Sequence, residues 1–439
     1  MRLPAPLIRI GIPIKRAGLR TVRAALLRTV RAEPAPGDDP SRKVFILLVS
    51  AWGMGGTIRA AINLAGYLAD HHEVEIISTY RRRERPYFAF DPRVTVTALD
   101  DERPGALPWL VRHLRRLLRR FSSTLYHPAD IRKDDHNLWT DVQLVRRLRK
   151  QRGVLIGTRP GLNILAADLQ APGLVTVGVE QMNFASHVRH LRRAIVNRYA
   201  RLDALAVLTE QDRAAYEQAL DGKAPPIWRI PNTVHDLEPP LADLSAKRIF
   251  AAGRYTSQKG FDLLIEAFIP VAARHPDWEL RICGRGIRKQ ELIDLIDRRG
   301  LARQVTLAGP SEDIPGEMAR ASIYALSSRY EGFPLVLIEA MSKGMAVVAF
   351  DCPTGPADIV DDHGNGILVP PQDVEALTAG LLEMIEDEPL RRRCASAAVE
   401  TAREYTMSAV GPGWDAMLES VSRPARAPSE RAGRSLAAG

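Results

Sequence analysis

Two glutamates, Glu331 and Glu339, stand on either side of a predicted helix start. A turn with Gly332 and Pro334 precedes an apolar helical pattern over residues 335–342, and we predict Pro334 as the first helical residue because its missing N–H would be unpaired there. A helix N-terminus carries unpaired N–H groups and a partial positive charge, so it holds phosphate well. Carboxylates beside a phosphate site are poor phosphate ligands but good acceptors for sugar hydroxyls. This layout fits a nucleotide sugar, in which hexose, diphosphate and ribose follow one another.

The segment EGFPLVLIE, which contains both glutamates, resembles the E-x7-E motif of retaining glycosyltransferases of the GT-B fold, family 4 in particular. The resemblance covers residues 43–421 and is most specific between 251 and 371. It implies an α/β fold with two doubly wound, Rossmann-like domains facing across a cleft. It also implies that Glu339 binds the ribose hydroxyls and that Glu331 lies close to the reacting carbon. The alternative for the motif alone is a loop–helix junction whose two acids are merely solvated.

Departure of a nucleoside diphosphate places negative charge on the leaving oxygen, so catalysis needs fixed positive groups there. Arg254 and Lys259 follow the predicted strand 249–252 in GRYTSQKG, where the family places an Arg and a Lys on the diphosphate. Two solvated loop charges are the alternative. The resemblance therefore implies catalytic roles for Glu331, Arg254 and Lys259. The donor contacts that it implies are Gly55, Gly56, Arg254, Lys259, Gly284, Arg285, Gly286, Glu331, Gly332, Phe333, Leu335, Val336 and Glu339.

The glycine-rich loop 53–56 joins a predicted strand, 43–50, to a predicted helix, 57–69. It lacks the full G-x-G-x-x-G spacing and no acid follows at the ribose-binding distance, so a dinucleotide site is disfavoured. In the family this loop lets the backbone approach the donor phosphates, and a tight turn that only needs glycine is the alternative. No D-x-D motif lies in a suitable loop, and the cationic side chains could replace a metal. We therefore predict a site with no metal and no cofactor besides the nucleotide-sugar substrate.

The acceptor side is expected beyond the carboxyl ends of the first domain's strands, where open α/β sheets bind their ligands. The predicted strands 154–157 and 174–179 lead to Arg159 and Glu180, and His187 follows. These three residues are the predicted acceptor contacts, with His187 also a catalytic candidate. Related enzymes often read E-H-x-N in this segment, whereas this chain has Gln181 in place of the histidine. A structural role for His187 is the alternative.

Alternating strand and helix patterns divide the chain into two doubly wound domains joined by a short linker. The predicted parts are a basic extension and linker (1–40), an acceptor-side domain (41–234), a linker (235–246), a nucleotide-sugar-binding domain (247–405), a C-terminal helix (406–421) and a disordered tail (422–439).

Composition narrows the possible classes of protein. The 439 residues suffice for two domains with large cores, and no run of 18 apolar residues is present that would span a membrane. Three widely spaced cysteines indicate neither a disulfide framework nor a zinc site and fit a reducing cytoplasm. The net charge of +9 comes from residues 1–31 and 112–150, and the remainder of the chain is net acidic. Neither basic stretch interleaves exposed aromatic residues, so we predict no nucleic-acid partner.

Both basic stretches contain an amphipathic helical pattern. In the first, Leu19, Val22, Leu26 and Val30 recur at helical spacing among arginines. A segment on an anionic membrane surface and a poorly ordered extension explain it equally well. In the second, the apolar residues are Trp109, Leu110, Leu114, Leu117, Leu118 and Phe121, and the basic ones are Arg112, Arg115, Arg116, Arg119 and Arg120. It predicts either a membrane-docking helix or an ordinary surface helix whose apolar stripe faces the core.

The sequence and the resemblance together predict a cytoplasmic, metal-independent hexosyltransferase, and the resemblance implies that it is a retaining one. A peripheral position on the inner face of the cell membrane is the alternative to a location free in the cytoplasm. Its donor would be a nucleoside-diphosphate sugar, with UDP the commonest choice in the family. Its acceptor would be a saccharide or lipid-linked molecule in cell-envelope polysaccharide or teichoic-acid-type glycosylation. The alternatives are a GT-B sugar-nucleotide epimerase and a non-catalytic nucleotide-binding protein on the membrane surface.

Overall fold

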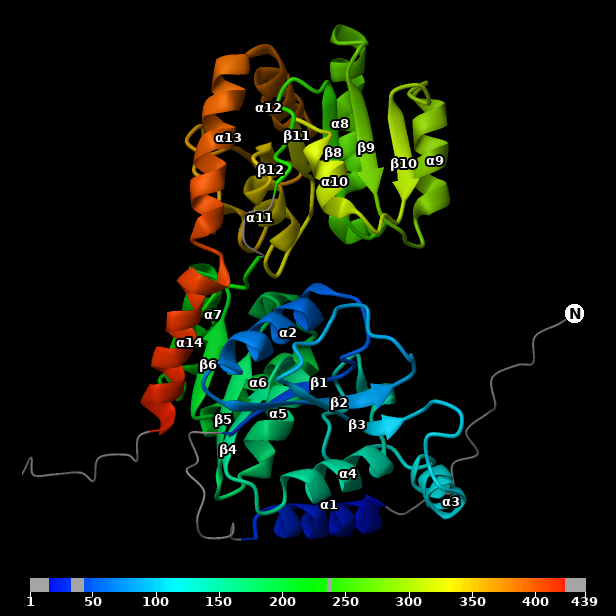
Figure 1. Ribbon diagram of the computed structural model, residues 1–439, viewed down its shortest axis with the longest axis vertical. Helices are drawn as coiled ribbons and strands as arrows, with labels where there is room; N and C mark the ends of the chain where they lie inside the picture. The colour runs from blue at the N-terminus through cyan, green and yellow to red at the C-terminus, as the bar shows by residue number, and fades with distance from the viewer. Residues whose placement is uncertain (1–15, 33–42, 235–238, 423–439) are drawn as a thin grey trace, which may run out of the picture.

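The computed structural model describes residues 16–32, 43–234 and 239–422, which form two α/β domains stacked end to end (Figure 1). Parts of the predicted segment 1–40 and of the predicted linker 235–246, and the predicted tail beyond Ser422, lie outside the described residues. Within the described ranges, no helix is both long enough and apolar enough to cross a membrane.

The first domain is built on a seven-stranded parallel sheet with the order β3-β2-β1-β4-β5-β6-β7. Its strands are β1 (Lys43–Leu48), β2 (Glu73–Arg81), β3 (Thr95–Asp101), β4 (Gly153–Gly157), β5 (Leu174–Val179), β6 (Ala204–Val207) and β7 (Ile227–Arg229). Its helices are α1 (Arg16–Val30), α2 (Gly56–Leu68), α3 (Trp109–Leu118), α4 (Leu138–Leu148), α5 (Pro160–Leu169), α6 (Arg189–Arg198) and α7 (Glu210–Leu220).

Alternation along β1 shows how this sheet buries both of its faces. Phe45 and Leu47 pack into the core shared with α4, α5 and α6, whereas Val44 and Ile46 pack into the core shared with α2. Side chains of a strand point alternately to opposite faces, so a strand covered on both sides must be apolar throughout. The continuous apolar run 44–48 is therefore what a central parallel strand requires.

The second domain repeats this plan with six parallel strands in the order β10-β9-β8-β11-β12-β13. The strands are β8 (Arg248–Ala252), β9 (Glu279–Cys283), β10 (Val305–Gly309), β11 (Ile323–Leu326), β12 (Ala346–Phe350) and β13 (Ile367–Val369). The helices are α8 (Phe261–Arg274), α9 (Lys289–Arg298), α10 (Ile314–Ala319), α11 (Leu335–Ser342), α12 (Val374–Glu386) and α13 (Glu388–Arg403).

The chain passes between the domains twice. Val234, at the end of the first domain, forms a parallel bridge with Thr406. The last helix, α14 (Met407–Ser422), then packs on the first domain beside α2, as Figure 1 shows. Val410, Trp414 and Met417 lie in the same core as the α2 side chains. The predicted C-terminal helix therefore belongs structurally to the first domain.

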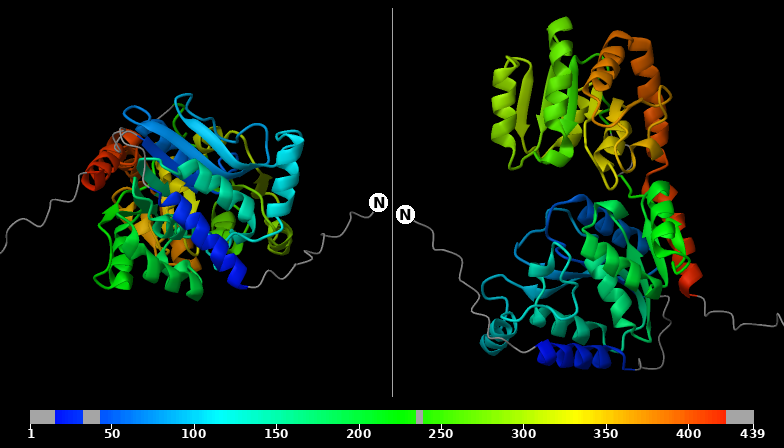
Figure 2. Two further views of the ribbon diagram at one scale, coloured as in Figure 1. Left: turned by 90° about the horizontal axis from the view of Figure 1, so that it is seen from below. Right: turned by 180° about the vertical axis from the view of Figure 1, so that it is seen from behind.

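The first basic helix, α1, is part of the folded domain. Val30 is buried in the core next to α4 and α5, and Leu26 packs against that core. Arg23 donates to Asp168 and to the carbonyl of Thr124, and Arg31 donates to the carbonyls of Asp168 and Leu169. The reading of this segment as a poorly ordered extension is therefore wrong for residues 16–32. Its apolar stripe packs against the core of the first domain, on the side remote from the second domain (Figure 2).

The second basic helix, α3, has the opposite arrangement. Trp109 and Leu110 are each 62% exposed, and Leu114 and Leu117 are half exposed. Arg115 is turned inward to a buried Asp100, to which Arg119 is also paired. The alternative in which the apolar stripe faces the core is therefore wrong, because the stripe faces outward and the buried contacts are made by arginines.

Candidate active site

Glu331 is held at the end of the loop that follows β11. Its N–H donates to the carbonyl of Pro353 at 2.8 Å, and its carbonyl accepts from the N–H of Thr354 at 3.0 Å. The helix α11 begins at Leu335, as predicted, but Pro334 precedes it as the cap and is not its first helical residue. Pro334 has ψ 69°, outside the helical region, so the prediction for this one residue is wrong.

The carboxylate of Glu331 is buried and paired. Lys259 Nζ lies 2.5 Å from its Oε1, and the Ser328 hydroxyl donates to the same oxygen at 2.5 Å. Lys259 comes from the turn between β8 and α8, and its alkyl chain crosses Gly253, where a Cβ would lie 3.0 Å from Lys259 Cε. The structure thus brings the predicted acid and the predicted cation into direct contact.

Glycine allows the loops of the second domain to meet at this point. Gly260 has φ +60°, and a Cβ there would lie 2.0 Å from the carbonyl oxygen of Ser327. Gly284 has φ +155°, and a Cβ there would lie 1.8 Å from the carbonyl oxygen of Gly253. Any side chain at either position would collide with backbone. The loops after β8, β9 and β11 therefore converge at the carboxyl edge of the sheet, where α/β sheets bind ligands.

The remaining predicted donor residues of this domain surround the same edge. Arg254 is exposed and donates to Gln258 Oε1 at 3.0 Å. Arg285 is exposed next to Gly286, and its carbonyl accepts from the N–H of Tyr255 at 2.9 Å. Phe333 and Leu335 are buried beside the start of α11, whereas Val336 is partly exposed. The two arginines are thus available at the rim while the apolar residues fix the helix start.

Glu339 lies on α11 and faces the first domain. Its carboxylate accepts from Arg59 of α2 at 2.5 Å, which joins the two domains. Burial raises the pKa of Glu339, and the guanidinium of Arg59 opposes that rise. A Cβ on Gly56 would contact Leu335 Cδ1 at 3.5 Å, so the predicted glycine loop lies directly against the start of α11. Arg59 was not predicted from the sequence. A cation in the first turn of a helix that has no acid there is unfavourable for the helix, and this could have marked Arg59 as a residue with a partner elsewhere.

The acceptor-side candidates lie in the first domain and are turned inward. Glu180 is buried, and its Oε1 accepts from Asn163 at 2.8 Å and from the hydroxyl of Tyr199. His187 Nε2 is 3.5 Å from Glu180 Oε2 and 3.4 Å from the hydroxyl of Tyr216. Glu180 and His187 are therefore brought together inside the domain, in a network whose other members the sequence did not reveal.

Arg159 does not join that network. Its Nη2 pairs with Asp130 at 2.9 Å, and Asp130 Oδ2 also accepts from the N–H of Gly161 at the start of α5. This pair fixes the turn after β4, with the guanidinium about a quarter exposed.

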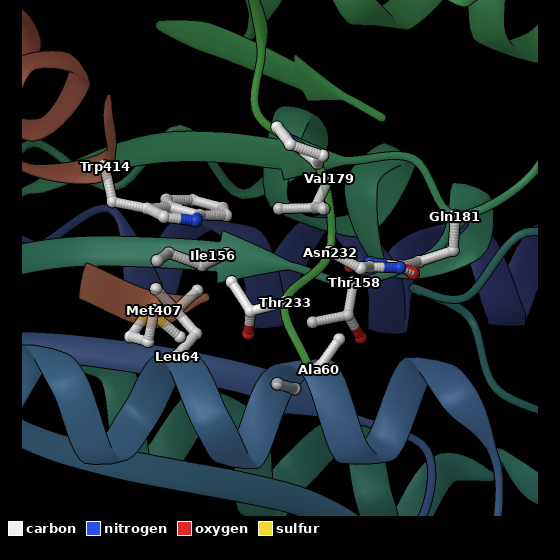
Figure 3. Close-up of a pocket in the computed structure, with 12 residues that line it drawn as sticks. Ala60, Leu64, Ile156, Thr158, Val179, Gln181, Asn232, Thr233, Met407 and Trp414 are labelled. Carbon is white, nitrogen blue, oxygen red and sulfur yellow. Dashed lines mark hydrogen bonds between the residues drawn. The ribbon is translucent and has the colours of Figure 1, made fainter. Parts of the chain in front are cut away.

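Gln181, which stands where related enzymes have a histidine, pairs with Asn232. Asn232 Nδ2 donates to Gln181 Oε1 at 2.8 Å, and Gln181 Nε2 donates back at 3.3 Å. Both line a cavity of about 20 Å³ between α2, β4, β5 and α14, together with Thr158, Thr233, Met407 and Trp414 (Figure 3). This volume holds about one water molecule, so the cavity is too small for a nucleotide or a sugar.

The two domains touch next to Glu331. A Cβ on Gly332 would lie 2.1 Å from the carbonyl oxygen of Gln181, and Asn183 Nδ2 lies 3.4 Å from the carbonyl oxygen of Glu331. Segment 181–183 of the first domain therefore forms the wall opposite Glu331. Asn183 was not predicted, and its contact depends on a partner in the other domain.

Comparison with known proteins gives a consistent picture. Residues 237–401 match the family described as glycosyl transferases group 1. The chain is 36% identical over 402 residues to an exopolysaccharide phosphotransferase of Streptomyces coelicolor, covering 89% of this chain and 42% of that protein. It is 26% identical over 386 residues to the amylovoran biosynthesis glycosyltransferase AmsD of Erwinia amylovora, covering 86% of this chain and 99% of that protein. The chain thus spans less than half of the first relative and nearly all of the second.

Solved structures share the arrangement of the two domains. One is S. aureus TarM, in a complex that contains UDP, with a TM-score of 0.68 and 17% identity over 86% of this chain and 99% of that chain. Another is Anabaena HepE in complex with UDP and glucose, with a TM-score of 0.64 and 19% identity over 86% of this chain and 100% of that chain. At these identities the likeness concerns the fold.

Proposed function

We propose that the chain transfers a hexose from a UDP-sugar to an acceptor hydroxyl, because its residues 237–401 match the glycosyl transferases group 1 family and its two domains have the GT-B fold. The observation that carries this proposal is the pair of acids around the start of α11. Glu331 is bound to Lys259 on one side, and Glu339 faces the first domain on the other. Relatives named as glycosyltransferases and neighbours solved with UDP support the choice of reaction and donor.

In the proposed donor complex, the diphosphate lies between the start of α11 and the two cations of the β8–α8 turn. Arg254 and Lys259 stabilise the negative charge of the departing diphosphate, aided by the N–H group of Val336, since that of Leu335 donates to the carbonyl of Phe333. Glu339 accepts from the ribose hydroxyls, and Glu331 accepts from hexose hydroxyls near the reacting carbon. The loop containing Gly55 and Gly56 lies beside the phosphates, because Gly56 is next to Leu335 at the start of α11. We propose further that the anomeric configuration is retained and that no metal is needed.

We assign His187 a positioning role and not a direct catalytic one. Its ring contacts Glu180 and Tyr216 within the domain, and it ends the short turn 184–186 that Asn183 caps. This turn follows the wall that faces Glu331. His187 therefore shapes the acceptor side through the backbone of residues 181–187.

The acceptor that we propose carries phosphate groups. Residues 181–202 contain five arginines and no acid. Arg189, Arg192 and Arg193 share one face of α6 because they are spaced by three and four residues, and no carboxylate of the described residues pairs with them. Three neighbouring cations destabilise a helix unless an anion lies beside them. A lipid-linked or wall-polymer acceptor in cell-envelope glycosylation provides such an anion, and two relatives are named for poly(glycerol-phosphate) and poly(ribitol-phosphate).

We also propose that the protein works at the cytoplasmic face of the cell membrane, where α3 docks. Its exposed apolar stripe is flanked by Arg112, Arg116 and Arg120, which make no ion pair with the described residues. Exposed apolar and cationic groups on one helix are the combination that binds an anionic bilayer surface.

The proposed function is tested first without an acceptor. UDP-, GDP- and ADP-sugars are screened for thermal stabilisation, and the best donor is offered with phosphate-bearing polymers, neutral saccharides and membrane extracts. Transfer with retained configuration, undiminished by excess chelator, supports the proposal. An isomerised nucleotide sugar as the sole product would establish the epimerase instead. Binding with neither transfer nor hydrolysis would establish a non-catalytic nucleotide-binding protein.

A further inference from the structure

Arg59 is a charged residue of the cleft that the chemistry described so far does not use. It lies near the start of α2, with its N–H bonded to the carbonyl of Gly55 at 3.0 Å. Its guanidinium reaches across the cleft to Glu339, 280 positions later in the chain, with Nη1 2.5 Å from Oε1. The side chains of Arg59 and Glu339 are 27% and 20% exposed, so the pair is shielded from bulk solvent on most sides.

Helix stability does not explain where these two charges are placed. A cation near a helix N-terminus opposes the helix dipole, and an anion in the last turn does the same. Arg59 lies in the first turn of α2, and Glu339 lies in the last turn of α11. Each charge therefore weakens its own helix, and their contact across the cleft offsets the loss.

The surroundings of Glu339 leave half of its carboxylate open. Oε1 is bound to Arg59, whereas Oε2 makes no hydrogen bond with the described residues and is not a buried unpaired atom. The other titratable group close to it is Tyr324 of β11, whose pKa is raised by burial and by the charges of both Glu331 and Glu339. Arg59 is thus the cation that compensates the buried charge of Glu339, and it is itself supported by the ring of Phe88, 6.0 Å from its guanidinium carbon.

We propose that Arg59 is a positioning residue of the donor site, which holds Glu339 ionised and oriented so that its free oxygen accepts from the ribose hydroxyls. This inference rests on the proposed function, because it assumes that Glu339 meets a ribose. The first domain would then contribute to donor binding through a residue that touches no donor atom.

The opposite role would have Arg59 compete with the donor for Glu339. In that case, removing Arg59 would strengthen nucleotide binding. In the positioning role, removing it weakens binding, and the loss depends on pH. A carboxyl that is buried without its cation takes up a proton at higher pH, and the neutral form is a poorer acceptor for hydroxyls. Because Arg59 opposes the rise that burial causes in the pKa of Glu339, its removal raises that pKa further, so the affinity of an Arg59→Ala variant would fall toward acid pH and recover as pH rises.

The experiment measures binding of UDP, GDP and ADP to the full chain by calorimetry between pH 6 and pH 8.5. We expect Arg59→Ala to weaken the best nucleotide about tenfold or more at the acid end and less at the alkaline end. Arg59→Lys keeps the charge and should restore most of the affinity and the flat pH profile. The 2′-deoxy nucleotide should bind wild type more weakly than the parent nucleotide does. Its affinities for wild type and for Arg59→Ala should be similar, because it lacks one of the hydroxyls that Glu339 would bind.

A double variant tests whether Arg59 acts through Glu339. If it does, Arg59→Ala combined with Glu339→Gln binds no more weakly than Glu339→Gln alone. The matched control is Arg281→Ala, which removes an arginine of similar exposure from an ion pair with Glu317 away from the cleft, and its pH profile should match wild type. Additive losses, or tighter binding by Arg59→Ala, would overturn the inference. Failure of wild type to bind any of the three nucleotides would instead overturn the proposed function.

Discussion

The contact between Glu331 and Lys259 joins residues separated by 72 positions and places opposite charges where the proposed reaction needs both. Lys259 is 14% exposed and Glu331 is 7% exposed, so neither charge is fully hydrated. A buried ion pair is retained at a cost in desolvation, and hydrophobic replacements of such pairs are often neutral or stabilising. We read this pair as serving the chemistry of the cleft.

We expect Lys259→Ala and Glu331→Gln each to reduce transfer by about a hundred- to a thousandfold, the usual effect of removing one fixed group that stabilises transition-state charge. Glutamine is preferred at position 331 because a smaller side chain would leave the ammonium of Lys259 buried without a partner. Initial rates and circular dichroism are measured together. Lys247→Ala, which removes a surface lysine paired with Asp277, is the control and should leave the rate unchanged. Near wild-type transfer by either cleft variant would refute the assignment.

At the scale of elements, the approach of the loop before α11 to segment 181–183 depends on Gly332. A Cβ there would lie 2.1 Å from the carbonyl oxygen of Gln181, which is closer than any unstrained contact. We expect Gly332→Ala to push this loop away from the opposite wall and to lower kcat about tenfold or more, since small displacements from a reactive geometry are costly. Melting temperature should change little, because each domain keeps its own core.

The control for this variant is Gly413→Ala. Gly413 lies in α14, where an added Cβ would be 4.0 Å from its nearest neighbour and alanine favours the helix. Its kcat should equal that of wild type. If Gly332→Ala were equally active, the close approach of the two domains in this structure would not be the reactive arrangement.

The start of α7 gives a prediction about pH. Thr209 caps this helix by accepting from the N–H of Asp212, and its hydroxyl donates back to Asp212 Oδ2 at 2.8 Å. Burial raises the pKa of Asp212 to about 6, helped by the negative charges of Glu180 and Asp358. A carboxyl whose pKa is higher in the folded than in the unfolded protein stabilises the fold below its unfolded pKa, and this contribution is lost as pH rises through the folded value.

Between about pH 4 and pH 6, ionisation of Asp212 should therefore lower the free energy of unfolding by up to about 3 kcal/mol. Asp212→Asn cannot ionise, so the difference in stability between this variant and wild type should move in the variant's favour over that range and then become constant. Urea denaturation at several pH values measures it. A difference that does not vary with pH would show that Asp212 ionises as freely in the folded as in the unfolded protein.

Local patterns identified those elements whose signals are local. The helix 335–342 and the strand 174–179 have the predicted bounds, and the predicted strands 154–157 and 249–252 begin one residue earlier than expected, because an apolar pattern or run defines each of them. The helix α5 was not predicted. All ten of its residues are buried, so it has no polar face and no amphipathic period. The edge strand β3 was also missed, because it is only partly buried and its sequence carries two acids at its end.

The candidate site shows the same difference between local and long-range signals. Glu331, Glu339, Arg254 and Lys259 could be named because they lie in short motifs of fixed spacing. Arg59, Asn183 and the partners of Glu180 could not, since each acquires its role from a contact with a distant part of the chain. Residue type and spacing therefore suffice to predict most of the second domain's residues in the proposed site and Gly55 and Gly56 of the first, whereas Arg59 and Asn183 emerge only from the folded chain.

For the whole molecule, the helices near the two ends of the described chain both stabilise the first domain. The basic helix α1 covers α4 and α5 on one side, and α14 covers α2 on the other (Figures 1 and 2). The apolar stripe of α1 is therefore occupied. Among the segments that the structure describes, α3 is the basic helix that leaves its apolar face to solvent.

This arrangement sets the last prediction, which concerns binding to membranes. Arg115 and Arg119 are held by Asp100, so replacing them would disturb the fold as well as the surface. Arg112, Arg116 and Arg120 have no such partner in the described chain and lie beside the exposed stripe. We expect a triple Arg→Glu variant at these positions to lose about a hundredfold or more in affinity for anionic vesicles, at about 1 kcal/mol for each charge near the surface.

Vesicles of phosphatidylglycerol and phosphatidylcholine are compared with vesicles of phosphatidylcholine alone in a sedimentation assay. Wild type should bind the anionic vesicles and lose much of that binding at high salt, because exposed charges are screened. Trp109→Ser with Leu114→Ser should weaken binding at every salt concentration, since the apolar part of the interaction is not screened. The matched control replaces Lys289, Arg298 and Arg303, exposed cations of the second domain, with glutamate and should bind like wild type. Equal loss in the control would show that net charge and not α3 determines binding, and unchanged binding by the α3 variants would remove the membrane from the proposed function while leaving sugar transfer intact.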